Sequence, residues 1–465
     1  MTFALLRPRM AAGAHSGKLA AVLAATIALT ASATWATPLL VVDASSGAVL
    51  MEQEATKPWY PASLTKLVTV YAALKAVKDK RISLDTPLVV SARAAKMPPS
   101  KMGFKPGTEV TLDNALKMLM VKSANDLAIV IAEGISGSVE NFAGEMNRVA
   151  AGLGMHQSHF VNPNGLHNDE HYSSAKDMAL VAMALYRDFP EHEDLYGIGA
   201  LRLGSQIIPT HNGLIGRYPG AEGMKTGFTC PAGFNVVVSA TRGGRQLIAV
   251  VLGYPSAKSR TLKAASLLDI SFAGRSSGPP LASLPDVGGS PPNMRSQVCT
   301  ANRQEPGEDD YAVPVASNGP SGASDSESSA AFFASDGRSS GATTSSGVSA
   351  IAAQMATRPY FEPIPVYLGR APGYTGPSVG ARDARPSPSV GAAVTAAIAA
   401  RSKEAAKTEK AEKPVKHARA RPSAKPRPEA KPKPAATPKP DAPKPEASKG
   451  KHAGKGKKKP EKPET

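Results

Sequence analysis

The feature that most constrains the fold is a change of composition near residue 276, which divides the 465-residue chain into two unlike parts. Before it, apolar residues recur at the spacings of helices and strands. After it, Pro, Gly, Ser and Ala dominate, and a segment of this composition buries too little apolar surface to fold by itself. Residues 37–275 are therefore the predicted folded domain, and they are numerous enough for a sizeable hydrophobic core.

Both ends of this predicted domain indicate antiparallel strands. Residues 39–52 predict one hairpin, and residues 234–253 predict a second around an Arg-Gly-Gly-Arg turn at 242–245. Between them, apolar residues at helical spacing predict a mostly helical middle. The order strands, helices, strands predicts the α/β (α+β) class, with an antiparallel sheet flanked by helices, followed by a long disordered C-terminal region.

A Ser-x-x-Lys string stands at residues 63–66, where Pro61 favours the beginning of a helix. Residues three apart share one helix face, so the amine of Lys66 can approach the hydroxyl of Ser63. A serine is a poor nucleophile until a base removes its proton. A lysine serves as that base when burial or a second cation lowers its pKa, and Lys225 is the candidate cation. On its own, the string is more typical of an ordinary helix start with a solvated lysine.

Two further strings follow in the same half of the chain. Ser-Ala-Asn at 123–125 interrupts an apolar helical stripe, and Asp126 is expected to cap the next helix. Lys-Thr-Gly at 225–227 is expected to open a Val-rich strand, where the small Gly227 permits close approach of a substrate. Separately, a helix corner and a plain edge strand explain these strings. In combination, the three strings predict a serine acyl-transfer site that works without histidine.

The order and context of these strings resemble the serine-type D-alanyl-D-alanine carboxypeptidases, which are low-molecular-mass penicillin-binding proteins with a β-lactamase/DD-peptidase-like fold. Further strings typical of that family stand at residues 39–43, 162–166 and 171–178. The resemblance extends over residues 37–272, about half of the chain.

The resemblance implies a role for each candidate residue. Ser63 is the expected nucleophile, Lys66 the general base and Ser123 the relay of a proton to the leaving amine. The expected oxyanion donors are the backbone N–H groups of Ser63 and Phe228. The expected substrate-binding residues are Asn125, Lys225, Thr226, Gly227, Phe228 and Arg260. For Arg260, a surface position stays open as the alternative. No cofactor is expected, and no metal is expected because no His or Cys cluster has ligand spacing.

The implied activity is removal of the C-terminal D-alanine from peptidoglycan stem pentapeptides through an acyl-enzyme, with β-lactam antibiotics as inhibitors. A DD-endopeptidase of the same family, which cleaves peptidoglycan cross-links, stays open because the motifs are shared. A non-catalytic wall-binding protein is a third hypothesis, although no motif residue is missing. A β-lactamase is disfavoured, since no Glu-x-x-Leu-Asn string stands between the second and third motifs.

The N-terminal residues 1–36 have a basic start, an apolar run at 19–31 and small residues before a cleavage site. This pattern predicts a signal peptide, with an uncleaved anchor as the alternative. The expected location is the periplasm or cell envelope of a bacterium. In such an oxidising compartment Cys230 and Cys299 are able to form a disulfide, although two free thiols stay open.

The C-terminal part divides into a predicted linker at 276–400 and a basic tail at 401–465. The linker contains an aromatic island at 358–376, for which docking as a single strand and disorder are both open. The tail holds 21 Lys and Arg against 8 Asp and Glu, so it carries most of the net charge of +17. An exported tail meets no nucleic acid, so anionic wall polymers or a membrane surface are the predicted partners, with a solubilising linker as the alternative.

Overall fold

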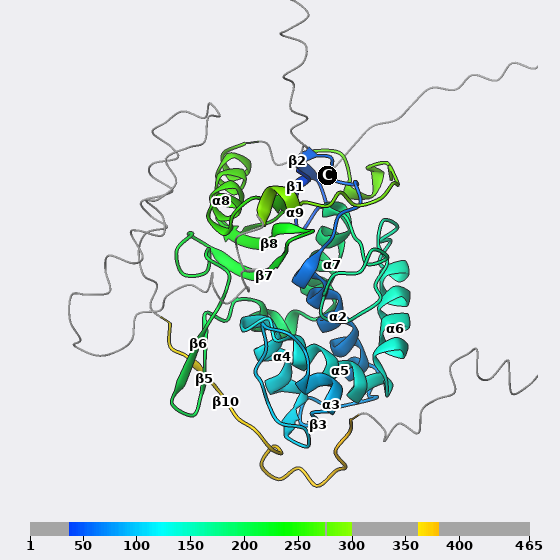
Figure 1. The fold of residues 1–465 in the computed structure, drawn as a ribbon. Helices are drawn as coiled ribbons and strands as arrows, with labels where there is room; N and C mark the ends of the chain where they lie inside the picture. The colour runs from blue at the N-terminus through cyan, green and yellow to red at the C-terminus, as the bar shows by residue number, and fades with distance from the viewer. Residues whose placement is uncertain (1–36, 275–276, 300–360, 381–465) are drawn as a thin grey trace, which may run out of the picture. The chain divides into compact units, whose positions relative to one another are not determined.

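The fold is built around an antiparallel sheet of five strands in the order β2-β1-β9-β8-β7 (Figure 1). The computed structural model describes residues 37–274, 277–299 and 361–380. The strands of this sheet are β1 (Leu39–Asp43), β2 (Val49–Gln53), β7 (Ala221–Thr229), β8 (Gly233–Arg242) and β9 (Arg245–Tyr254). The two predicted hairpins are confirmed, and they join into one sheet because β1 pairs with β9.

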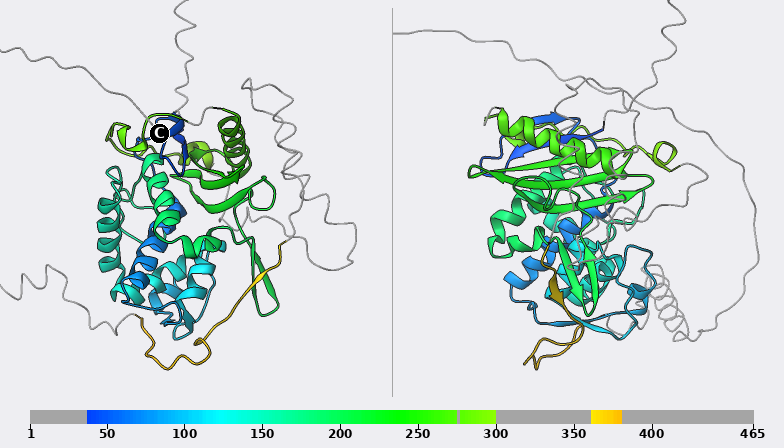
Figure 2. Two further views of the ribbon diagram at one scale, coloured as in Figure 1. Left: turned by 180° about the vertical axis from the view of Figure 1, so that it is seen from behind. Right: turned by 90° about the vertical axis from the view of Figure 1, so that its left-hand side faces the viewer.

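The alternation of apolar residues assigns the two faces of the sheet. In β1, Leu39 and Val41 pack in a hydrophobic cluster with α8 (Ala257–Ala273). Leu40 and Val42 belong to the main core on the opposite face. Successive strand residues point to opposite faces, so a strand buried on both sides needs apolar residues at every position. Figure 2 shows α8 on one face of the sheet and the other long helices on the second face.

On the second face of the sheet, α7 (Ala175–Asp188) packs against β1, β8 and β9, and further helices pack beside it to form the main core. These further helices are α2 (Thr65–Lys78), α3 (Ala92–Ala95), α4 (Leu112–Val121), α5 (Asn125–Ser136) and α6 (Val139–Gly152). The periodicities that predicted α2 and α4 are confirmed. The start of α7 also follows its sequence signal, because the Ser174 hydroxyl accepts a hydrogen bond from the Asp177 backbone N–H. Within the described residues, every helix is too short or too polar to cross a membrane.

Short elements complete the described structure. They are η1 (Ala62–Leu64), β3 (Pro87–Val89), β4 (Glu109–Thr111), η2 (Pro190–Tyr196), β5 (Ala200–Leu203), β6 (Gln206–Pro209), η3 (Leu281–Ser283), α9 (Arg295–Val298) and β10 (Ile364–Val366). Strands β3 and β4 pair with each other, and β10, β5 and β6 form a small separate sheet.

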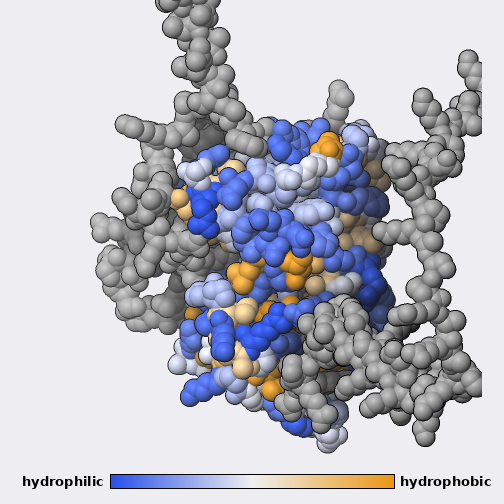
Figure 3. Space-filling view, turned by 45° about the vertical axis from the view of Figure 1, so that its right-hand side comes forward, coloured by the Kyte–Doolittle hydropathy of each residue, from blue (hydrophilic) through white to orange (hydrophobic). Residues whose placement is uncertain are grey.

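On the face in Figure 3 the described residues are mainly polar, and hydrophobic residues form small, separate patches. The exposed large hydrophobic residues of the described part lie on four separate segments: Ile207, Ile270, Val287, and the adjacent pair Tyr367 and Leu368. Scattered residues of this kind are normal on soluble proteins and indicate no docking surface by themselves.

Two local predictions are wrong. Asp126 does not cap α5, whose N-cap is Ala124; its carboxylate instead accepts hydrogen bonds from the backbone N–H groups of Met102 and Gly103. The third string does not open a strand, because residues 225–227 lie inside β7. The residues before them have weak strand propensity, and pairing with β8 overrides that preference.

The aromatic island at 358–376 is docked over its described residues, drawn in gold in Figure 1. Strand β10 pairs in parallel with β5. Gly199 lies so close to the ring of Phe361 that a side chain at 199 would collide with it. Glu109 accepts hydrogen bonds from Arg370 and from the Ser378 hydroxyl. The signal-peptide and basic-tail predictions lie outside the described residues.

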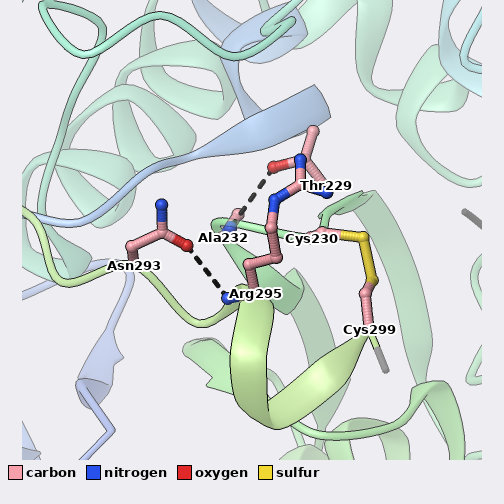
Figure 4. The surroundings of a disulfide bond; sticks show 6 residues. All are labelled: Thr229, Cys230, Ala232, Asn293, Arg295 and Cys299. Atoms are coloured by element: carbon pink, nitrogen blue, oxygen red, sulfur yellow. Dashed lines mark hydrogen bonds between the residues drawn. A yellow bond between two sulfur atoms is a disulfide. The ribbon is translucent and has the colours of Figure 1, made fainter. Parts of the chain in front are cut away.

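The structure joins Cys230 and Cys299 in a disulfide, with 5.7 Å between their Cα atoms (Figure 4). Cys230 directly follows β7, and Cys299 directly follows α9. A backbone hydrogen bond of 2.9 Å from Met294 to Pro231 supports the same contact. The segment 277–299 is thereby fastened to the end of the strand that carries residues 225–227.

We expect replacement of both cysteines by serine to lower the free energy of unfolding by about 2–4 kcal/mol, because the cross-link closes a long loop and restricts the unfolded chain. Urea denaturation of the oxidised parent and of the double variant measures this difference. The reduced parent serves as the control and is expected to match the variant. Coinciding midpoints for the oxidised parent and the variant would contradict the prediction.

Candidate active site

Ser63 lies on η1, the short 3₁₀ turn directly before α2, rather than inside α2. Its side chain is nevertheless on the face that the i, i+3 spacing predicts. The Lys66 Nζ atom is 2.8 Å from Ser63 Oγ. Ser63 retains 8% of its exposure, whereas Lys66 is fully buried. A hydroxyl near the surface is therefore backed by an amine on the inside.

The amine of Lys66 is held by three oxygen atoms. Nζ lies 2.8 Å from each of Ser63 Oγ, Asn125 Oδ1 and the backbone oxygen of Asn164. An ammonium group donates three hydrogen bonds, and a neutral amine donates two and accepts one. When the amine is neutral, Asn125 and Asn164 accept its two protons. Its lone pair is then directed at the Ser63 hydroxyl, as a general base requires.

Ser123 occupies the break between α4 and α5. Its φ of 59° is in the left-handed region, which costs a residue with a side chain about 1–3 kcal/mol. Its hydroxyl is buried and accepts a hydrogen bond of 2.8 Å from Lys225 Nζ. The site thus contains two serine–lysine pairs, one from a single helix start and one from segments 102 residues apart.

Asn125 links the second string to the first. Its Oδ1 atom faces Lys66, and its Nδ2 donates to the backbone oxygen of Pro98 at 3.1 Å. Its backbone N–H donates to the oxygen of Ser100 at 2.7 Å. The loop between α3 and β4 therefore fixes the orientation of the Asn125 amide, with its oxygen toward Lys66.

The third string lies on β7, which is an edge strand of the five-stranded sheet. A Cβ atom on Gly227 would lie 2.9 Å from both the Pro61 oxygen and the Ser63 nitrogen. Only glycine lets the two backbones approach so closely. The Ser63 N–H is thus next to the residue that precedes Phe228. Phe228 itself is fixed by stacking on Phe234, with 4.1 Å between ring centroids.

Arg260 lies on α8, and only 4% of the residue is exposed. The alternative prediction of a surface position is therefore wrong. Its Nη1 donates to the backbone oxygen of Asn235 at 3.1 Å. Asn235 is the β8 residue that pairs with Gly227. The guanidinium is therefore fixed against the sheet beside the third string.

A loop at 162–166 completes the surroundings of Lys66, although its sequence indicated only a family likeness. The backbone oxygen of Asn164 faces the amine, and Asn162 Oδ1 accepts the Gly165 N–H at 2.7 Å. Gly165 has a φ of 81°, and any side chain there would collide with the Ala62 oxygen. The loop is thus seated directly on the turn that carries Ser63. A backbone carbonyl has no signature in a sequence, so this contact was not predictable.

His171 contacts Thr65, which lies between Ser63 and Lys66 in the sequence. Its Nδ1 accepts the Val161 N–H at 3.2 Å, which leaves the proton on Nε2, 2.8 Å from Thr65 Oγ1. Burial, with the charges of His159 and His167, lowers the pKa of His171 to about 3. A neutral histidine therefore supports Thr65 without contacting Ser63, in keeping with a histidine-free nucleophile.

We expect His171 to contribute to acid sensitivity. The unfolded chain protonates it near pH 6.5 and the folded protein only near pH 3, so unfolding takes up a proton between these values. Its contribution to stability is complete above pH 6.5 and is lost as pH falls toward 3.

Urea denaturation between pH 4 and 7 of the parent and of His171→Gln measures this contribution. The difference in unfolding free energy between them should shrink toward acid by on the order of a few kcal/mol. His156→Gln, at an exposed position, is the control and should leave the profile of the parent unchanged. A difference between parent and His171→Gln that does not vary with pH would contradict the assignment.

Comparison with known proteins gives consistent matches. A family model described as D-alanyl-D-alanine carboxypeptidase matches residues 25–256. D-alanyl-D-alanine carboxypeptidase DacF of Bacillus subtilis is 35% identical over 240 residues, which are 50% of this chain and 61% of that protein. D-alanyl-D-alanine carboxypeptidase DacA of Escherichia coli K12 is 36% identical over 241 residues, which are 50% of this chain and 60% of that protein.

Among solved structures, penicillin-binding protein 5 from Haemophilus influenzae has 34% sequence identity and a TM-score of 0.49. The match covers 51% of this chain and 70% of that chain. The chain thus matches only 60–61% of the length of the two curated relatives.

Proposed function

The chain belongs to the D-alanyl-D-alanine carboxypeptidase family, and on this premise we propose that it is a serine DD-carboxypeptidase that removes the terminal D-alanine from peptidoglycan stem pentapeptides. One observation carries the proposal: Lys66 contacts both the Ser63 hydroxyl and the Asn125 amide, and Ser123, two residues before Asn125, pairs with Lys225. A nucleophile, a base and a second proton carrier are the groups that acyl transfer from an amide requires.

The first half of the proposed reaction forms an acyl-enzyme. The neutral amine of Lys66 takes the proton of Ser63, and Oγ attacks the carbonyl carbon between the two D-alanines. The backbone N–H groups of Ser63 and Phe228 stabilise the oxyanion. As the C–N bond breaks, Ser123 relays to the leaving amine the proton that Lys66 took from Ser63, so that Lys66 is neutral again, and D-alanine departs with Ser63 left as an ester.

In the second half, a water molecule gives a proton to Lys66 and attacks the ester carbonyl, the bond to Ser63 Oγ breaks, and Lys66 returns the proton to Ser63 as the shortened peptide leaves with a new carboxylate. Four other residues hold the substrate before acylation. Thr226 and Arg260 bind its terminal carboxylate, Lys225 supplies positive potential, and Asn125 holds a substrate amide. A β-lactam presents a reactive amide to the same nucleophile, so penicillin acylates Ser63 and inhibits the enzyme. The close approach that Gly227 allows leaves room for the substrate along β7.

The remaining proposals concern the location and the flanking segments. Residues 1–36 direct export, residues 37–275 form the catalytic domain, and the enzyme works in the periplasm or cell envelope. The tail at 401–465 binds anionic wall polymers or a membrane surface through its excess of Lys and Arg. The cell-wall substrate supports export, because peptidoglycan lies outside the cytoplasm.

We expect Ser63→Ala to abolish covalent labelling by a fluorescent penicillin, since Ser63 Oγ is the atom that forms the proposed ester. Lys66→Ala should fold and label at least about 100-fold more slowly, because a general base contributes about that factor. Lys75→Ala, an exposed lysine on the same helix, is the matched control and should label like the parent. Equal labelling of Ser63→Ala and the parent would remove Ser63 as nucleophile.

We expect turnover to require a free C-terminal carboxylate. Amidation of a D-Ala-D-Ala peptide should lower kcat/KM about 10- to 100-fold, because hydrogen bonds to a charged group are lost. Arg260→Ala should reduce the ratio of kcat/KM for the peptide acid to kcat/KM for the peptide amide. Identical turnover of both peptides by the parent would contradict the carboxylate pocket. Product analysis on intact muropeptides separates the two family activities, since cleaved cross-links would identify an endopeptidase.

A further inference from the structure

We propose that Asn235 is a positioning residue, which holds the turn carrying Ser63 at the distance from β7 that acylation requires. The inference rests on the proposed acyl-transfer function. It concerns a residue near the beginning of β8, a strand that carries none of the three motif strings. Its side chain acts through backbone groups rather than on the substrate.

The side chain of Asn235 joins three separate segments. The residue is fully buried on β8. Its Nδ2 donates to the backbone oxygens of Tyr60 and Pro61 at 3.0 and 3.2 Å. Its Oδ1 accepts the Gly253 N–H of β9 at 2.8 Å. The chain that enters η1 is therefore fastened to the centre of the sheet.

An asparagine amide is the side chain that matches these partners. The two carbonyls before Ser63 require two donors, and the Gly253 N–H requires one acceptor; a primary amide supplies all three. An aspartate at this position presents oxygen to two carbonyl oxygens. An apolar residue removes the side-chain partners of the Tyr60 oxygen and of the Gly253 N–H, which is costly in free energy, and leaves Pro61 with only its hydrogen bond from the Leu64 N–H.

The turn that Asn235 holds is strained. Ala62 lies between the fastened Pro61 and Ser63, and its φ of 48° is in the left-handed region, which a residue with a Cβ atom disfavours. Strained residues persist where the surrounding structure determines their conformation. Hydrogen bonds at Tyr60 and Pro61 restrain the turn from one side, so their loss allows Ala62 to relax and Ser63 to move.

The position of Asn235 also sets the separation between the two proposed oxyanion donors. Asn235 pairs with Gly227 in the sheet register, and Gly227 is the residue that approaches the Ser63 nitrogen. The Phe228 N–H lies on β7, whereas the Ser63 N–H lies on the fastened turn. One residue of β8 thus connects the two backbones that must both face the oxyanion. Geometry of this kind affects the rate of acylation more than the initial binding.

The experiment measures acylation of the full chain by a fluorescent penicillin, with the dissociation constant of the initial complex and the acylation rate constant determined separately. We expect Asn235→Asp to lower the rate constant about 10- to 100-fold and to change the dissociation constant less than about threefold. Asn235→Ser keeps a single donor, so its acylation rate constant should fall less than that of Asn235→Asp. If the aspartate variant fails to fold, the serine variant tests the inference instead, with a smaller but measurable loss of the rate constant and the same limit on the dissociation constant.

Two comparisons separate positioning from a general loss of stability. Ser239→Ala removes a buried hydrogen bond of the same strand, to the Tyr186 hydroxyl, far from η1. It should lower the melting temperature and leave the acylation rate constant unchanged. Asn235→Asp should also recover part of its rate, relative to the parent, as pH falls, because a protonated carboxyl regains one donor. Asn235→Ala should not recover.

The inference is overturned if Asn235→Asp acylates at the rate of the parent, or if Ser239→Ala loses rate as much as the Asn235 variants do. The inference is also overturned if the dissociation constant of Asn235→Asp for the initial penicillin complex rises by the same factor as its acylation rate constant falls. Failure of the parent itself to label at Ser63 would instead refute the proposed function.

Discussion

The buried amine of Lys66 is the interaction on which the rest of the site depends. A polar group removed from water needs hydrogen-bond partners, or its burial is strongly unfavourable. Its three oxygen partners come from η1, the start of α5 and the 162–166 loop. These segments are distant in sequence, and satisfying one amine requires that they meet. The same requirement that stabilises the fold therefore brings the Ser63 hydroxyl beside the Lys66 amine.

Strain accompanies this arrangement at two positions. Ala62 and Ser123 both have positive φ values without being glycine. Each lies at a break before a helix, where the backbone turns to present a serine hydroxyl. The free energy that this geometry costs is offset by packing around it, including the close contacts of Gly165 and Gly227 with the Ser63 turn. Glycine at these two positions is a condition for the approach of loop and strand.

Segments beyond the sheet extend the domain further than composition indicates. The disulfide fastens residues 277–299 to the end of β7. Residues 361–380 reach β5 and Glu109, although their sequence contains several prolines. Proline is compatible with a short edge strand, and this is the position that β10 occupies. Pro- and Gly-rich composition predicts the absence of a separate core, but a short apolar motif within it still finds a place on an existing one.

Local patterns in the sequence determined the terminal hairpins, the helices α2 and α4, and the contact of Ser63 with Lys66. Each depends on a period or spacing of a few residues, which the chain carries wherever it folds. Only the tertiary structure decided that residues 225–227 lie inside a strand, that the Asn164 carbonyl faces Lys66, and that the Asn235 amide binds the backbone before Ser63. These features depend on strand pairing and on contacts between segments about 100 or more residues apart. Such contacts leave no periodic trace in a sequence, because a backbone carbonyl or a buried amide finds its partner only after the chain has packed.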